Sequence, residues 1–247
     1  MPEHFRALAV ILAIAATIFV VAKGPASTLL TTTGEFERRR NLWLGITFAV
    51  FLAHNFWIFM LLAAVLLSVA SFKDENRVGL VLFVLLAVPM IRDEVPGFAG
   101  VRYLFDLEYF RLISLVVLVP AFLQELNKHS WKYFSESSPD KFLYAYLALN
   151  LILLFFAGSL TGTMRSGFLF FIDVFVPYAV ASRLIKDTAA LRTALASYVI
   201  GAMIIAGVGI IEFSKSWLLY STLEQSLGVN WSLGSYLRRG ESLRAMG

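Results

Sequence analysis

The stretch GFLFFIDVFVPYAVASR, residues 167–183, decides the fold class. It is almost wholly apolar, and its length suits a helix that crosses the roughly 30 Å hydrocarbon core of a bilayer. Backbone inside lipid must satisfy its own hydrogen bonds, which restricts a spanning segment of this kind to a helix. The stretch therefore predicts a transmembrane helix that carries one carboxylate, Asp173, at membrane depth.

The composition of the whole chain agrees with this class. Of its 247 residues, 59% are hydrophobic and 15% are charged, whereas a soluble domain carries about 25% charged residues. The absence of Cys excludes disulfides, thiolate catalysis and Cys-ligated metals, and the three His have no metal-ligand spacing. The net charge of +4 is dispersed between apolar runs, which favours contact with membrane lipids over nucleic acid. We expect an integral membrane protein without a metal or other cofactor.

Apolar runs of spanning length recur along the chain. They predict an all-α, polytopic transmembrane helical bundle of about seven spans within residues 1–212. The candidate spans are residues 6–22, 42–71, 78–92, 109–126, 142–160, 167–185 and 193–212. The second is overlong and interrupted by AHNF, which leaves one tilted helix and a re-entrant hairpin as alternatives. The third is short and contains Pro89.

Basic residues between the spans bear on orientation. With a cytoplasmic N-terminus, the inner and outer connections carry nearly equal numbers of Lys and Arg, because ERRRN at 37–41 falls outside. A re-entrant hairpin at 42–71 returns that cluster to the inner side, as the positive-inside rule requires. Both alternatives place residues 213–247 outside the cytoplasm.

Residues 213–247 follow the last span and form the second predicted region. Apolar residues recur every three to four positions from Trp217 to Leu227, with polar residues between them. This pattern is typical of an amphipathic helix, lying either in the membrane interface or on the bundle. The three arginines Arg238, Arg239 and Arg244 follow it. We expect them in the first part of a periplasmic loop near the membrane surface.

Asp173 is the most informative polar residue inside a span, because a charge at the centre of a membrane helix costs at least about 2.5–3.5 kcal/mol. Pro177 lies four residues on and removes the helical partner of the Asp173 carbonyl. Arg165 precedes Asp173 by two turns, about 80° around the helix, and is a candidate counter-ion. A substrate site and a structural ion pair are both compatible with these residues.

The segment 95–124 combines charge with aromatic side chains. A turn at Pro96–Gly100 precedes Arg102, further charges of alternating sign and several Tyr and Phe. Such a segment at a membrane surface is suited to binding sugars or lipid headgroups. An aromatic belt with snorkelling arginines explains the same pattern.

Three segments together resemble the N-terminal half of bacterial O-antigen ligase-like and O-antigen polymerase-like membrane proteins. They are PGFAGVRYLFDLEYFRLISLVVLVPAFL, RSGFLFFIDVFVPYAVASR and LGSYLRRGESLRAMG. That family has about a dozen helices and a large periplasmic loop with an Arg-x-x-Gly pattern that reaches a Pro. Arg244 and Gly247 match the start of the pattern, and the Pro lies beyond them.

The resemblance implies a protein of the bacterial inner membrane that moves a glycan from an undecaprenyl-diphosphate carrier to an acceptor sugar. Arg244 would stabilise the diphosphate leaving group, and Arg238, Arg239, Arg165, Asp173 and Arg102 would bind substrate. Polysaccharide-assembly proteins are possible partners under this interpretation. It also implies that Gly247 is a truncation point and that the chain alone is inactive. The alternatives are a permease or lipid-linked-glycan transporter using Asp173 and Pro177, and a non-catalytic membrane scaffold.

Overall fold

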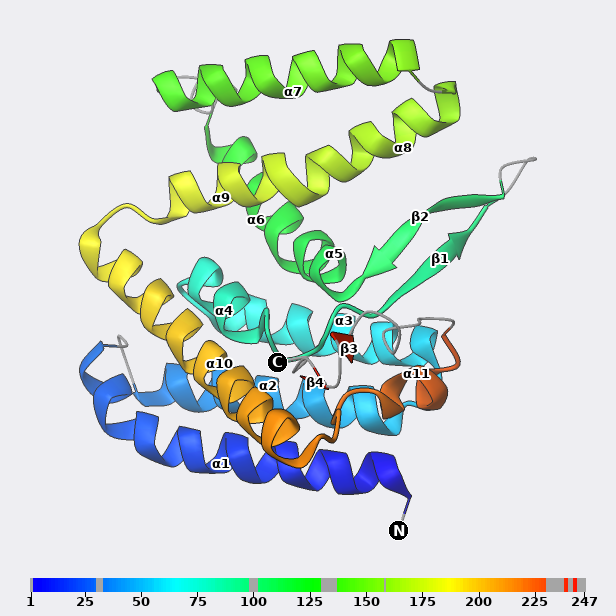
Figure 1. Cartoon of the computed structure of the whole chain (residues 1–247). Helices are drawn as coiled ribbons and strands as arrows, with labels where there is room; N and C mark the ends of the chain where they lie inside the picture. The colour runs from blue at the N-terminus through cyan, green and yellow to red at the C-terminus, as the bar shows by residue number, and fades with distance from the viewer. Residues whose placement is uncertain are drawn as a thin grey trace.

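The computed structural model describes residues 2–29, 33–97, 102–129, 137–157, 159–229, 238–239 and 242–243. Helices dominate this part of the chain (Figure 1). Two of its membrane-length helices contain a π-helical turn. The first half contains α1 (Glu3–Leu29), α2 (Thr33–Leu52), α3 (Phe56–Lys73), α4 (Arg77–Val84), α5 (Tyr109–Ile113), the π turn η1 (Ser114–Leu118) and α6 (Val119–Lys128). The second half contains α7 (Ser138–Ala157), α8 (Leu160–Phe170), the π turn η3 (Phe171–Phe175), α9 (Val176–Leu184), α10 (Thr188–Lys215) and α11 (Thr222–Leu227).

Two short antiparallel strand pairs accompany the helices. Strands β1 (Arg92–Pro96) and β2 (Tyr103–Glu108) form a hairpin, and β3 (Arg238–Arg239) pairs with β4 (Ser242–Leu243). The first hairpin replaces the loop expected after residue 95. It leads directly into α5, so strand and helix share a junction at Glu108–Tyr109.

Six helical segments of the described chain are long and apolar enough to cross a membrane: 3–26, 56–73, 109–128, 138–156, 160–184 and 188–215. The predicted all-α, polytopic bundle is therefore confirmed. Seven spans were expected, and the difference lies in residues 33–91. The expected span 78–92 is not among the six, and the expected span 42–71 divides into two helices, of which 56–73 is the candidate span.

The overlong run 42–71 belongs to two helices that fold back on each other. His54 between them adopts a left-handed backbone with φ of 51°. The side chain of Asn55 then accepts hydrogen bonds from the backbone N–H groups of Trp57 and Ile58, which caps α3. AHNF is thus a turn between two helices, which excludes the single tilted helix. The two helices form a hairpin, but α3 is itself long and apolar enough to span a membrane, so a re-entrant position stays a prediction.

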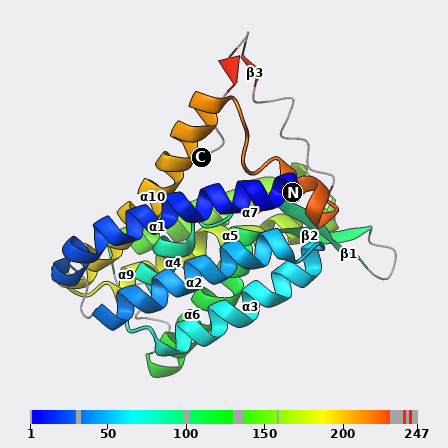
Figure 2. The same ribbon diagram turned by 90° about the horizontal axis from the view of Figure 1, so that it is seen from below.

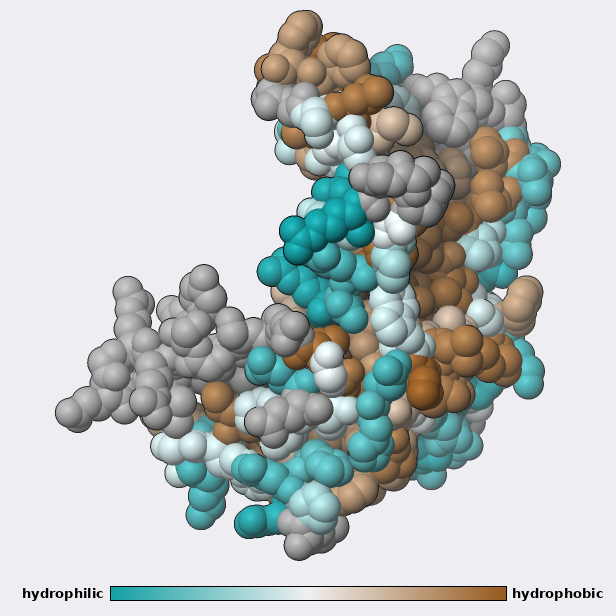
Figure 3. Space-filling model, turned by 90° about the vertical axis from the view of Figure 1, so that its right-hand side faces the viewer, coloured by the Kyte–Doolittle hydropathy of each residue, from teal (hydrophilic) through white to brown (hydrophobic). Residues whose placement is uncertain are grey.

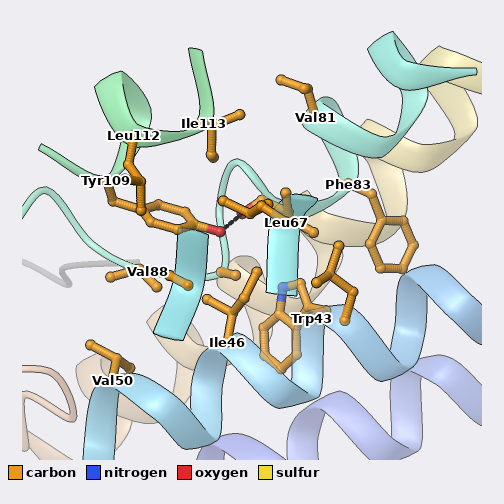
Figure 4. Packing of buried hydrophobic residues seen from close by; sticks show 14 of the residues in the cluster. Trp43, Ile46, Val50, Leu67, Val81, Phe83, Val88, Tyr109, Leu112 and Ile113 are labelled. Atoms are coloured by element: carbon orange, nitrogen blue, oxygen red, sulfur yellow. Dashed lines mark hydrogen bonds between the residues drawn. The ribbon is translucent and has the colours of Figure 1, made fainter. Parts of the chain in front are cut away.

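The run 78–92 is not a spanning helix. Its helical part, α4, ends at Val84, and strand β1 begins at Arg92. α4 is buried against α10, where the backbone carbonyl of Phe83 approaches Gly201. The carbonyl of Val84 accepts hydrogen bonds from the Ala87 N–H at 2.9 Å and from the hydroxyl of Tyr109 at 3.2 Å, which joins the end of α4 to α5 (Figure 4). Apolar composition here reflects burial inside the bundle.

Most of the helices run between two ends of the molecule, which differ in the elements that meet there (Figure 1). α1, α2 and α3 lie side by side, α10 crosses them obliquely, and α7 and α8 form a separate antiparallel pair (Figures 1 and 2). We call the end with the β1–β2 hairpin, the α2–α3 turn and α11 the hairpin end. The opposite end, with the α3–α4 and α9–α10 connections, we call the basic end. The described Lys and Arg of the segments that meet there include Lys23, Arg38, Arg39, Arg40, Lys73, Arg77, Lys128, Lys141, Arg183, Lys186 and Arg192.

The core lies between α1, α2, α4 and α10. Trp43 and Phe83 are fully buried, and Phe19 makes an edge-to-face contact with Trp43 and stacks on Phe83. Ile46, Leu67 and Tyr109 continue the same cluster toward α5 (Figure 4). This cluster holds the strand–helix junction against the bundle and so fixes where the residues after Glu108 point.

The segment after α10 packs on the bundle. α10 ends with Ser216 in the left-handed region, and α11 ends at Gly228 with φ of 69°, as the position of that glycine predicts. Tyr220, Leu223 and Leu227 are buried in the core cluster. Burial raises the pKa of the Tyr220 hydroxyl, and the nearby Glu212 carboxylate adds to the effect. Of the two alternatives for this amphipathic segment, packing on the bundle matches these contacts.

Candidate functional site

Asp173 pairs with an arginine, as its position in a membrane span requires. The arginine is Arg111 on α5, whose Nε donates to both carboxylate oxygens of Asp173, at 3.3 Å and 3.1 Å. Nη1 of Arg111 donates to the backbone carbonyl of Asp106 at 2.6 Å and lies 3.3 Å from Oε1 of Glu108. Among the described residues Nη2 has no partner. The ion pair therefore joins the start of α5 to the middle of the α8–α9 helix and leaves donors available.

The predicted counter-ion, Arg165, lies elsewhere. Its Nε donates to the carbonyl of Leu104 at 2.6 Å and its Nη2 to the carbonyl of Tyr103 at 2.7 Å. Its guanidinium also lies 3.7 Å from the centre of the Tyr103 ring. The predicted Arg165–Asp173 pair is thus wrong. Arg165 instead ties strand β2 to α8, because the hairpin presents two backbone acceptors and an aromatic face within reach of that side chain.

Two π turns lie against each other beside the ion pair. η1 follows α5, and η3 contains Asp173. Each ends two residues before a proline, Pro120 in one helix and Pro177 in the other. π turns are rare and are frequent at functional sites. The recurrence of this arrangement in two neighbouring spans marks the region as more than a packing surface.

A pocket of about 340 Å³ opens between α7, α8 and the π turn η3. We call it the α7–α8 pocket, and it is lined by Arg111, Leu154, Ser166, Leu169, Phe170, Asp173 and Val174. Four of these side chains are apolar, and the ion pair and one hydroxyl are its polar groups. α7 contributes only one lining residue and is exposed over most of its surface. Apolar walls with a few convergent polar groups are typical of ligand sites.

A second pocket, of about 460 Å³, lies between the hairpin and the end of α11. We call it the hairpin pocket, and it is lined by Arg92, Asp93, Glu94, Tyr103, Asp106 and Gly228. Hydrophilic residues gather beside a hollow when the molecule is viewed from this end (Figure 3). Asp106 lines this pocket, and its carbonyl binds Arg111, which lines the α7–α8 pocket. The polar hairpin pocket and the largely apolar α7–α8 pocket are thus connected through the hydrogen bond between Asp106 and Arg111.

The remaining predicted site residues are the arginines at positions 102, 238, 239 and 244. Arg102 is exposed at the start of β2, and its carbonyl accepts a hydrogen bond from the Gly97 N–H. The backbone of Arg238 and Arg239 forms β3. Arg244 lies outside the described residues. Their predicted role in binding a diphosphate remains a prediction.

Sequence reasoning missed the residues that complete the site. Arg111 was visible only as one of several charges after residue 95, and its pairing with Asp173 depends on the turn from β2 into α5. The opposition of Glu94 and Asp106 across the hairpin likewise needs the strand register. The available signal was the density of charged and aromatic residues from 92 to 111.

The arrangement can hold an amphipathic molecule at the edge of the bundle. An apolar chain fits the walls formed by Leu169, Phe170 and Val174, while hydrophilic groups meet Arg111 and the hairpin pocket. Compared with known proteins, the chain matches no family model, no curated protein and no solved structure.

Proposed function

We propose that this chain is part of an inner-membrane glycosyltransferase of the O-antigen ligase or polymerase type. Its substrate is a glycan carried on undecaprenyl diphosphate, and the carrier binds beside the Arg111–Asp173 pair. The observation that carries the proposal is the junction of a largely apolar pocket and a polar pocket at Arg111. A lipid-linked glycan has the same sequence of properties: an apolar chain, a charged linkage and a hydrophilic head.

Arg111 supplies the contact at the linkage. A guanidinium presents planar donors that match phosphate oxygens, and Nη2 is the donor without a partner among the described residues. Asp173 and Glu108 leave this site without excess positive charge, so a diphosphate needs further cations. Arg238, Arg239 and Arg244 are the proposed source, with Arg244 stabilising the leaving group as its charge develops.

A binding measurement tests the carrier site. Native mass spectrometry of the purified chain should show undecaprenyl diphosphate bound more tightly than uncharged undecaprenol, and Arg111→Gln should remove most of that difference. Arg77→Gln is the matched control, because Arg77 donates to Gln124 near the basic end. Equal binding of both lipids, or an effect equal in the two variants, would contradict the carrier site.

A transfer assay tests the role of Arg244. In a form of the protein that transfers glycan, Arg244→Lys should lower the rate by roughly 100- to 1000-fold, by analogy with the loss of one oxyanion donor. Arg238→Lys should have a milder effect, because a headgroup anchor needs only positive charge. An unchanged rate for Arg244→Lys would remove the proposed catalytic role.

A transporter of the same lipid-linked glycan is the second candidate, and it is favoured by the interrupted helices. α4 ends inside the bundle, and two spans contain a π turn followed by proline. Discontinuous helices commonly form substrate sites in transporters. Movement of a fluorescent undecaprenyl-diphosphate glycan across proteoliposomes, without change in its glycan, would support this candidate over the transferase.

A further inference from the structure

We propose that the hairpin pocket is a saccharide subsite in which Glu94 and Asp106 accept hydrogen bonds from sugar hydroxyls. The inference rests on the proposed function, because it assigns the pocket to the glycan end of the lipid-linked substrate. The pocket and its two carboxylates lie on the β1–β2 hairpin, next to the residues that bind Arg111.

The hairpin places two like charges directly opposite each other. Glu94 and Asp106 are register partners in the antiparallel pair, so their side chains project from the same face of the sheet. Like charges in this position destabilise a hairpin. Neither carboxylate forms an ion pair within the described residues. Like charges held opposite each other without an ion pair are a local cost of the kind expected at a functional site.

The charge of the pocket selects the class of ligand. Among the charged residues that line the pocket, Asp93, Glu94 and Asp106 outnumber Arg92, and Glu94 and Asp106 share one face of the hairpin, so a phosphate group is disfavoured. An ionised carboxylate accepts hydrogen bonds and donates none, which suits a ligand rich in hydroxyl donors. Tyr103 also lines the pocket and adds a hydroxyl group, while the Arg165 guanidinium covers one face of its ring. A neutral saccharide meets all of these requirements.

A divalent cation is the other ligand that carboxylates attract. Among the described residues, no three Asp, Glu, His or Cys side chains come together closely enough to hold a metal ion. The pocket volume of about 460 Å³ is also large for a single ion and leaves room for a sugar ring. The geometry therefore favours hydroxyl groups spread across the pocket over one cation at its centre.

The position of the hairpin pocket determines where each part of the substrate lies along the protein. The Asp106 carbonyl binds Nη1 of Arg111, so the sugar subsite begins where the proposed phosphate contact ends. The lipid chain then lies in the α7–α8 pocket, the linkage lies at Arg111, and the first sugars lie under the hairpin. Only a substrate with these three parts occupies both cavities at once.

The experiment compares two probes on the purified chain in nanodiscs: undecaprenyl diphosphate and undecaprenyl-diphosphate-linked N-acetylglucosamine. The wild-type chain should bind the sugar-bearing probe about 3- to 10-fold more tightly, which corresponds to one or two net hydrogen bonds. Glu94→Gln and Asp106→Asn should lose this preference and keep the affinity for undecaprenyl diphosphate. Both variants remove a like-charge repulsion, so they should not unfold the hairpin. Glu75→Gln, an exposed site at the basic end, is the control.

The outcomes separate the two proposals. If undecaprenyl diphosphate binds and the sugar adds nothing, or if both variants keep the preference, the saccharide subsite is overturned and the carrier site stands. If neither probe binds the wild-type chain, the proposed function fails and the subsite with it. A preference that appears only with added Ca²⁺ assigns the carboxylates to a cation and also overturns the subsite.

Discussion

Arg39 and Asp74 form a bidentate ion pair inside the bundle: Nε donates to Oδ2 at 2.8 Å and Nη2 to Oδ1 at 2.7 Å. Arg39 is fully buried. Its Nη1 donates to the hydroxyl of Ser197 at 2.8 Å, and its Nη2 to the carbonyl of Asn76 at 3.2 Å. One guanidinium thus connects α2, the α3–α4 connection and α10. This network holds the helices together at the basic end, as the hydrogen bonds of Arg165 hold strand β2 against α8 at the hairpin end.

Arg39→Met should destabilise the protein strongly. Removal of one partner leaves the Asp74 carboxylate buried without its main cation, and breaking a buried pair costs about 3–5 kcal/mol. Unfolding of the purified variant in detergent, followed by circular dichroism, measures the loss. Arg40→Met is the matched control, because Arg40 is half-buried and, among the described residues, its side chain bonds to its neighbour Asn41 alone. Equal losses in the two variants would show that the buried pair contributes nothing special.

The hairpin end and the basic end should face opposite sides of the membrane, with the basic end in the cytoplasm. Trp217 donates a hydrogen bond to Glu3, so the N-terminus lies at the same end as residues 213–229. The combination expected from the sequence, a cytoplasmic N-terminus with residues 213–247 outside the cytoplasm, is therefore wrong.

The chain contains no Cys, so single cysteines report position cleanly. Ser221→Cys at the hairpin end should react with a membrane-impermeant maleimide in intact cells. Glu75→Cys and Lys186→Cys, exposed at the basic end, should react only after permeabilisation. The reverse labelling would place residues 213–229 in the cytoplasm and contradict the proposed periplasmic transfer.

The sequence predicted the class of fold and the need of Asp173 for a cation, because both follow from the cost of polar groups in lipid. It did not predict Arg111 as that cation. Residues 111 and 173 are far apart in sequence, and their meeting depends on the strand–helix junction after Glu108. Apolar composition also failed to separate spanning helices from α4, since a short helix buried on all sides is as apolar as one in lipid. In the same way, ERRRN indicated a surface cluster, yet Arg39 within it is buried.

Arg165→Gln should loosen the β1–β2 hairpin. The change removes two charge-assisted hydrogen bonds to the carbonyls of Tyr103 and Leu104 and the contact with the Tyr103 ring. Because hydrogen bonds to charged groups contribute about 1.5–3 kcal/mol each, amide hydrogen exchange in residues 92–96 and 103–108 should accelerate at least tenfold. Arg102→Gln is the control, because Arg102 immediately precedes β2 and its side chain is exposed. Unchanged exchange in Arg165→Gln would mean that the core beneath α5 holds the hairpin without it.

The contact between α4 and α10 depends on a glycine, and the same substitution at another glycine should act in the opposite direction. A Cβ at Gly201 would lie 3.0 Å from the carbonyl oxygen of Phe83, a backbone atom that cannot rotate away. Gly201→Ala should therefore push the two helices apart and destabilise the protein by about 1–3 kcal/mol. At Gly34 in α2 a Cβ meets no atom within 4 Å, so Gly34→Ala should stabilise the helix by about 0.5 kcal/mol. Unfolding of both variants under identical detergent conditions shows whether each substitution lowers or raises the free energy of unfolding. If Gly201→Ala is as stable as Gly34→Ala, α4 does not pack closely on α10 in the membrane, and α4, which ends beside Tyr109, has a different position.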